Sequence, residues 1–179
     1  MMDRPESVPF LYKLILTNLP LVLDADALNL IAQNPALLES HGESVILTPH
    51  PGEMRCLQTA FGLDGQKTRI EQALDLAIRT SCTVILKGCR SVVASPDGSY
   101  SLNLSGCPAL ATAGSGDTLT GICGSFLAQG YSAYDAARLG AYVHGLAGEL
   151  LSPCGSRGVI ADDLASAAAR AIHRILPTA

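Results

Sequence analysis

The sequence contains no tryptophan and few other aromatic residues, with three phenylalanines and five tyrosines among 179 residues. Charged residues make up only 16% of the chain, the formal net charge is −4, and Lys and Arg form no run. A protein that binds a nucleic-acid backbone needs clustered positive charge. The composition therefore excludes nucleic acid as an expected partner.

Cysteine pairs of the C-x-x-C type are also missing, although the chain has six cysteines. Without that spacing, the usual zinc and redox sites are not expected. Cys82 and Cys123 lie inside apolar stretches, where cysteine behaves as a small hydrophobic residue, so we predict reduced thiols and a cytoplasmic protein. Residues 1–6 lack the apolar core of a signal peptide, and no apolar run could span a bilayer, so no membrane association is expected.

What the chain does have is a hydrophobic fraction of 48%. At this length, one domain with a substantial core is expected, and we predict a single domain over residues 1–179. Short aliphatic runs at 21–23, 45–47 and 83–86 alternate with segments whose apolar residues recur at helical spacing. This alternation predicts an α/β fold with a mostly parallel sheet and helices on both of its faces.

The first helix is expected over residues 8–19, where Pro20 would end it. A β-hairpin is expected around Pro96, Asp97 and Gly98. Further helices are predicted over 28–34, from 54 onward, and over 68–80, 115–129, 132–151 and 161–176.

Polar residues follow each of the three predicted parallel strands, where such sheets bind their ligands. They are Asp24 and Asp26, then His50, then Lys87. For the two aspartates, capping the next helix explains the sequence as well as a ligand or metal role does. Lys87 follows buried aliphatic residues and precedes Gly88, so we interpret it as directed at a phosphate. Among other polar residues, we interpret His144 as structural, His41 and His173 as surface residues, and Asn103 as a possible part of the pocket lining.

The strongest signal is Ala-Gly-Ser-Gly-Asp at 113–117, which runs into an amphipathic helix. A helix start presents free N–H groups and partial positive charge, and glycines allow an anion to approach them. The segment therefore predicts a phosphate-binding turn. Asp117 has two interpretations: it caps the helix, or it accepts a proton from a hydroxyl that attacks phosphorus. Taken alone, the segment favours the cap.

Four motifs in order resemble the ADP- or ATP-dependent NAD(P)H-hydrate dehydratases of the ribokinase-like superfamily. They are Asp-Ala-Asp-Ala-Leu-Asn at 24–29, Thr-Pro-His-Pro-Gly-Glu at 48–53, Leu-Lys-Gly at 86–88 and Ala-Thr-Ala-Gly-Ser-Gly-Asp at 111–117. The resemblance implies a ribokinase-like three-layer sandwich. It also implies repair of hydrated NAD(P)H: ADP or ATP phosphorylates the hydroxyl at C6 of the hydrated ring, and phosphate is then eliminated.

The resemblance also implies roles for particular residues. Asp117 would be the catalytic base, and the amides of Gly114, Ser115 and Gly116 would form an anion hole. Glu53 falls where the superfamily has an N-x-x-E motif and would act on Mg²⁺ through water, although His50 replaces the asparagine. Mg²⁺ is expected because the phosphoryl oxygens need neutralising. The nucleotide would contact Lys87, Gly88, Cys89, Arg90, Ser91 and Gly116, and the hydrated cofactor would contact His50, Asp117, Asp24 and Asn29.

The resemblance begins at about Pro20, so we predict an N-terminally truncated member of the family. The front portion of such a domain supplies strands and Gly-rich loops that help to hold the cofactor. Its loss would expose a sheet edge and apolar surface, so we expect a homo-oligomer or a partner that supplies the missing part.

Two other functions remain open. One is a kinase of the same superfamily that acts on a vitamin precursor, and the 48–53 motif favours the dehydratase over it. The other is a truncated nucleotide-binding subunit without catalysis.

Overall fold

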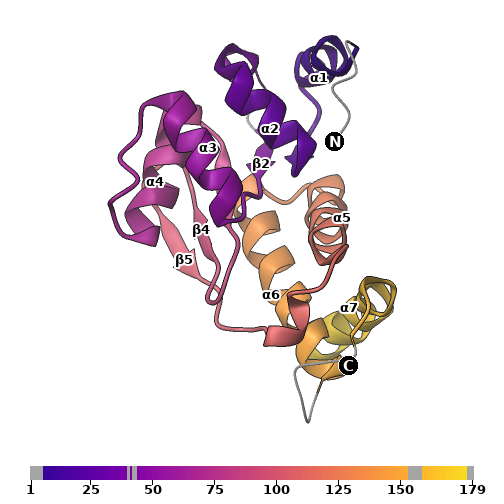
Figure 1. Cartoon of the computed structure of the whole chain (residues 1–179). Coiled ribbons are helices and arrows are strands. Elements are labelled where there is room, and N and C mark those ends of the chain that lie inside the picture. Colours follow the sequence, from indigo (N-terminus) through magenta and orange to yellow (C-terminus); the bar gives the residue numbers. More distant parts are fainter. Residues whose placement is uncertain (1–5, 40, 42–43, 153–158, 177–179) are drawn as a thin grey trace.

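The computed structural model describes residues 6–39, 41, 44–152 and 159–176 (Figure 1). Its elements follow one another along the chain as α1 Ser7–Ile15, β1 Leu21–Leu23, α2 Asp26–Gln33, the 3₁₀ turn η1 Pro35–Leu38, β2 Val45–Leu47, α3 Pro51–Phe61, α4 Arg69–Thr80, β3 Thr83–Leu86, β4 Val92–Ala94, β5 Tyr100–Leu102, η2 Pro108–Leu110, α5 Ser115–Ala128, α6 Ala133–Leu151 and α7 Ala161–Ile175.

The described strands form one five-stranded sheet in the order β1-β2-β3-β4-β5. β1, β2 and β3 are parallel, β4 is antiparallel to β3, and β5 is antiparallel to β4. Four of the five strands therefore point the same way, which confirms the predicted mostly parallel sheet. The β4–β5 hairpin is the predicted one, and Gly98 in its turn has a φ of 90°, a value that glycine adopts without strain.

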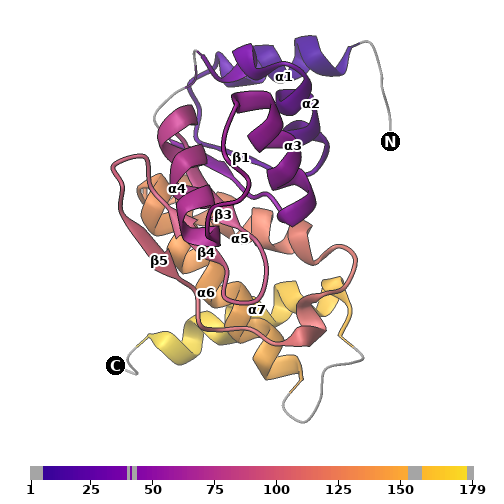
Figure 2. The ribbon, with the colours of Figure 1, turned by 60° about the vertical axis from the view of Figure 1, so that its left-hand side comes forward.

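Alternate residues along each strand divide the core into two halves. Val45 and Leu47 of β2 face one cluster, which is completed by apolar residues of α1 to α4. Ile46, between them, faces a second cluster formed with α5, α6 and α7. Because a strand directs successive side chains to opposite faces, both faces of the sheet are covered. The three layers, seen in Figures 1 and 2, confirm the predicted sandwich.

The first helix ends earlier than predicted. α1 stops at Ile15, four residues before Leu19. Thr17 closes the last turn through its hydroxyl, which donates to the Leu14 carbonyl at 2.6 Å, and Asn18 has a φ of 55°. Asparagine tolerates this left-handed conformation better than most residues, so the helix ends there before Pro20 is reached.

His41 lies differently from its interpretation, and the structure shows the contacts of Asn103. His41 is half-buried rather than on the surface, and its Nε2 lies 2.7 Å from the carbonyl oxygen of Thr80. The amide of Asn103 donates to the carbonyl oxygens of Ser105 and Ala141, at 3.2 and 3.0 Å. Asn103 therefore ties the segment after β5 to α6.

The longest described helix, α6, packs closely because it contains three glycines on its buried side. A Cβ on Gly145 would meet the side chain and, at 2.7 Å, the carbonyl carbon of Ser105. α6 therefore lies nearly against backbone at this point. None of the helices in the described ranges is long and apolar enough to cross a membrane.

Candidate active site

The candidate site lies at the edge where the parallel strands end. The backbone N–H of Lys87, just after β3, donates to the carbonyl of Pro49 at 2.8 Å. In the same way, the N–H of Thr48 donates to the carbonyl of Leu23 at 3.1 Å. These bonds continue the sheet by one residue, so the polar residues after β1, β2 and β3 emerge side by side.

Lys87 is the centre of a charged group. Its Nζ lies 2.7 Å from Oδ1 of Asp24 and 3.9 Å from Oε2 of Glu53. The side chains are 20%, 12% and 9% exposed, respectively, so water screens the attraction only partly. Asp24 does not cap the next helix, because α2 begins at an N-cap on Ala25 without a side-chain bond. Its carboxylate instead turns to Lys87, and its Oδ2 accepts from the Thr120 hydroxyl at 3.4 Å.

The start of α5 lies against this charged group. A Cβ on Gly116 would stand 3.2 Å from Oδ2 of Asp24 and 3.6 Å from Nζ of Lys87. A side chain here would fill the space between the helix and the charges. Gly114 is the N-cap of α5, and its φ of 82° suits glycine.

The amides of the expected anion hole differ in their bonding. The N–H of Ser115 donates to the carbonyl of Thr112 at 3.3 Å, so it has a partner already. Among the described residues, no backbone acceptor meets the N–H groups of Gly116 and Asp117. These two donors stand in the first turn of a fourteen-residue helix, where the helix dipole favours an anion.

Asp117 is exposed and stands in the first turn of α5. The helix start has no side-chain cap, and the carboxylate makes no hydrogen bond or ion pair within the described part of the chain. The capping interpretation of Asp117 is therefore not realised in this structure. Asp117 directly follows Gly116, the residue that lies against Asp24 and Lys87.

Beneath the turn, the buried hydroxyl of Ser115 lies 3.0 Å from Nε2 of His144 in α6. Burial lowers the pKa of His144 below 6.5; hydrogen bonding at Ser115 opposes this shift, and the charge of Lys87 adds to it. His144 is therefore neutral at pH 7, and it supports the residue that begins α5. The sequence indicated a structural histidine but not that it lies under the site.

His50 and Glu53 together cap the N-terminus of α3. Nδ1 of His50 accepts from the N–H groups of Gly52 and Glu53 at 2.9 and 3.1 Å, while Oε2 of Glu53 accepts from the His50 N–H at 2.8 Å. This is a capping box with histidine in the place of serine or threonine. Since Nδ1 accepts, the ring proton is on Nε2, which lies 3.4 Å from Oε1 of Glu53.

Within the described ranges, the remaining expected residues make no bond to the charged group. Gly88 has a φ of 148°, and its carbonyl accepts from the Ser91 hydroxyl at 3.1 Å. Cys89 and Arg90 are exposed, and Asn29 is half-buried in α2. Within the described ranges, no hydrogen bond or ion pair joins Asn29, Arg90 or Ser91 to Asp24, Glu53 or Lys87.

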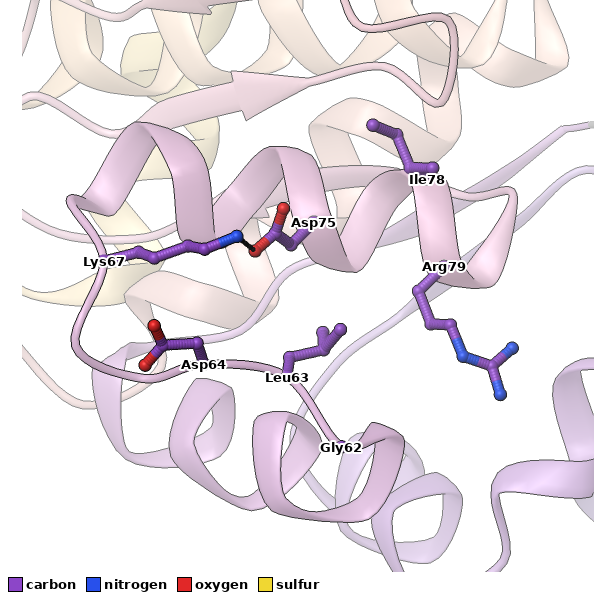
Figure 3. A pocket seen from close by; sticks show the side chains of 7 residues that line it. All are labelled: Gly62, Leu63, Asp64, Lys67, Asp75, Ile78 and Arg79. Atoms are coloured by element: carbon purple, nitrogen blue, oxygen red, sulfur yellow. Dashed lines mark hydrogen bonds and ion pairs between the residues drawn. The ribbon is translucent and has the colours of Figure 1, made fainter.

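A pocket of about 430 Å³ lies elsewhere, between the loop after α3 and the outer side of α4 (Figure 3). The residues that line it are Gly62, Leu63, Asp64, Lys67, Asp75, Ile78 and Arg79. Lys67 is paired with Asp75 at 2.7 Å, so its charge is already matched. The pocket contains none of the site residues that the sequence indicated.

No group of three or more potential metal ligands occurs among the described residues. Asp24 and Glu53 are the carboxylates closest to Lys87, and both already accept hydrogen bonds. This arrangement fits an ion such as Mg²⁺, which proteins hold through one or two carboxylates, waters and the phosphates of a substrate.

The profile of the NAD(P)H-hydrate dehydratase family matches residues 2–170. The chain belongs to this family. The match starts before Pro20, where the sequence motifs began, and includes α1. The chain is 44% identical over 146 residues to the bifunctional NAD(P)H-hydrate repair enzyme Nnr of Moorella thermoacetica. The aligned part covers 81% of this chain and 28% of the relative. It is 40% identical over 163 residues to the ADP-dependent (S)-NAD(P)H-hydrate dehydratase of Neisseria meningitidis serogroup B, covering 89% of this chain and 55% of the relative.

Solved structures agree with the ribokinase-like fold. The ADP/ATP-dependent NAD(P)H-hydrate dehydratase of Bacillus subtilis, co-crystallised with ATP/Mg²⁺, superimposes with a TM-score of 0.78 at 34% identity, covering 90% of this chain and 57% of that one. A ribokinase-like superfamily protein of Enterococcus faecalis gives a TM-score of 0.79 at 24% identity, covering 97% and 60%. The chain thus spans little more than half of the length of these structures.

Proposed function

We propose that the chain carries the nucleotide end of an NAD(P)H-hydrate dehydratase site and acts in ADP- or ATP-dependent repair of hydrated NAD(P)H. The observation that carries this proposal is the approach of Gly116 to Asp24 and Lys87, 3.2 and 3.6 Å from the position of an added Cβ. The absence of a side chain at Gly116 brings the start of α5 close to Lys87, so that an anionic ligand could contact both. Family membership supplies the chemistry.

In the proposed reaction, the C6 hydroxyl oxygen of the hydrated ring attacks the terminal phosphorus of the nucleotide. The bond from that phosphorus to its bridging oxygen breaks, and AMP leaves from ADP, or ADP from ATP. Asp117 accepts the hydroxyl proton, which its exposure and its unpaired carboxylate permit. Loss of the C6 phosphate together with a proton from the adjacent carbon then restores the double bond of NAD(P)H.

The phosphoryl group would be held by peptide N–H groups of the α5 turn, which comprises Gly114, Ser115 and Gly116. The free N–H of Gly116 supports this assignment, while the N–H of Ser115 would have to leave Thr112. The segment from Lys87 to Ser91 would hold the nucleotide, and Asp24, Asn29 and His50 would contact the hydrated cofactor. Mg²⁺, when bound, would neutralise phosphate oxygens, with Glu53 reaching it through water.

The decisive experiment compares the unaltered protein with Asp117→Asn. With hydrated NADH and ADP or ATP, the unaltered protein should restore the absorbance of reduced nicotinamide. Asp117→Asn should abolish this turnover, because the amide cannot accept the proton, while nucleotide still raises the melting temperature.

Full activity in Asp117→Asn would overturn the assignment of the base. Thermal stabilisation by nucleotide with no turnover in either protein would favour the non-catalytic nucleotide-binding subunit. Turnover of a vitamin-precursor alcohol, with none of hydrated NADH, would favour the kinase.

We also propose that the chain associates with itself or with a partner that supplies further strands of the sheet. Exposed apolar side chains on α1 and the loop after it support this, with Phe10 68% and Leu19 57% exposed. Among the described strands, β1 pairs only with β2, so one of its edges can accept another strand.

Finally, we propose that the protein acts in the cytoplasm, where thiols remain reduced. The described cysteines, Cys56, Cys82, Cys89, Cys107 and Cys123, are free thiols.

A further inference from the structure

Arg69, the first residue of α4, reaches across to the turn that follows β3. Its Nη1 donates to the carbonyl oxygen of Cys89 at 2.6 Å. Its Nη2 donates to the carbonyl oxygens of Leu86 and Lys87 at 3.2 and 3.3 Å. One guanidinium thus spans both sides of Gly88, at the segment proposed to hold the nucleotide.

The turn is shaped for this contact. Gly88 has a φ of 148°, which L side chains rarely adopt, and a Cβ there would lie 2.8 Å from Nη2 of Arg69. The planar guanidinium spreads its donors over two terminal nitrogens, so it reaches carbonyl oxygens on both sides of Gly88, whereas a lysine has its three donors on a single nitrogen. Glycine at 88 and arginine at 69 therefore both suit the close approach of the side chain to the turn.

The stability of α4 does not explain an arginine in this place. Positive charge at a helix start opposes the helix dipole. The start is already closed by Thr68 and Glu71, whose side chains each bond to the other residue's backbone N–H. Arg69 forms no ion pair within the part of the chain that the structure describes, so its charge adds to the potential beside the turn.

The same turn is held from its opposite side by the bond from the Lys87 N–H to Pro49. With Pro49 on one side and Arg69 on the other, the backbone of Lys87 is held in place. This fixes the direction in which the Lys87 side chain leaves the sheet to lie 2.7 Å from Asp24.

We propose that Arg69 is a positioning residue of the site, which clamps the 86–89 turn and adds positive charge beside the nucleotide phosphates. The clamp is a property of this chain alone, whereas its effect on the nucleotide rests on the proposed function. Amide hydrogen exchange over residues 84–92 therefore tests the clamp itself. The affinity for ADP tests the effect of the clamp on the nucleotide.

The variants are Arg69→Ala and the milder Arg69→Lys. Arg79→Ala is the control, because Arg79 lies near the other end of the same helix, away from the 86–89 turn (Figure 3). Its side chain is exposed and stacks on the Phe61 ring. In Arg69→Ala we expect the Lys87 amide to exchange about tenfold faster and ADP to bind about tenfold more weakly. Arg69→Lys should show about a threefold change in each, and Arg79→Ala should show neither.

Unchanged exchange at Lys87 in both Arg69 variants would overturn the clamp. Faster exchange with unchanged ADP affinity would overturn the role of the clamp in the site. If the unaltered protein does not bind ADP, the proposed function fails, whereas the exchange measurement still decides whether Arg69 holds the turn. Should Arg69→Ala not fold, Arg69→Lys carries both measurements.

Discussion

The charge of Lys87 is more than balanced by the two carboxylates beside it. It links Asp24 and Glu53, two carboxylates that would repel each other without it. The three side chains together carry a charge of −1, so they do not by themselves attract a phosphate. We therefore expect anion binding here to depend on the N–H groups at the start of α5 and on the charge of Arg69, which has no acidic partner among the described residues.

His144 gives the site a pH dependence that can be measured. Burial lowers its pKa in the folded protein below 6.5, so the unfolded chain takes up the proton more readily. Its contribution to stability is complete above the unfolded pKa and is lost as the pH falls from about 6.5 towards the folded pKa. The free energy of unfolding should therefore decrease in mild acid.

Urea unfolding followed by circular dichroism at about pH 7.5 and about pH 5.5 measures this loss. His144→Gln keeps an amide near Ser115 but cannot titrate, so it should lose less stability between the two pH values than the unaltered protein does. An equal loss in both proteins would show that the acid sensitivity arises at other groups.

The residues of the site were only partly accessible from the sequence. Lys87 and Gly116 were indicated, because a lysine after a buried strand and glycines at a helix start are local patterns. Asp24 was left open between a helix cap and a ligand, since its partner lies 63 residues away and is fixed only by the packing of the strands. Arg69 gave no signal, because its contacts are carbonyl oxygens of a distant turn.

The helices and strands were predicted more completely than the contacts. Aliphatic runs of three or four residues located β1, β2 and β3, because runs this short between polar residues favour a strand over a helix. The end of α1 was wrong, since Pro20 was given more weight than the left-handed Asn18. The capping box at His50 was not predicted either, because histidine is outside the usual capping residues.

Two adjacent helices use glycine for different reasons, and alanine substitution distinguishes them. In α5, a Cβ on Gly124 would meet no atom within 4 Å, so Gly124→Ala should raise the free energy of unfolding by about 0.5–1 kcal/mol through helix propensity. In α6, Gly145→Ala places a methyl group 2.7 Å from the Ser105 backbone. It should lower that free energy by about 1–3 kcal/mol.

Thermal and urea unfolding of the two variants beside the unaltered protein test this comparison. Because both changes add the same methyl group to a helix, any difference in sign reflects the neighbours. Similar stabilisation of both would mean that α6 can move away from Ser105 at little cost.

The chain as a whole combines a sheet that is packed on both faces with exposed apolar residues on and after α1. Both faces of the sheet are packed, so the exposed apolar residues around α1 are not part of an uncovered sheet face. Phe10, Tyr12, Leu16 and Leu19 are 68%, 47%, 44% and 57% exposed. We interpret these four residues, which belong to one short segment of the chain, as an interaction surface. The proposed association therefore predicts a mass in solution above the 18.6 kDa of one chain.

Sedimentation and light scattering of the purified protein measure that mass, and an apolar dye reports any surface left uncovered. Phe10→Lys should shift the protein towards the monomer, because a charge would have to be buried in the contact. Ile78→Lys is the matched control, since Ile78 is also exposed, at 55%, but lies on α4 beside the pocket of Figure 3. It should leave the mass unchanged. A monodisperse monomer with no dye signal would rule out self-association, and an oligomer unaffected by Phe10→Lys would place the contact away from α1.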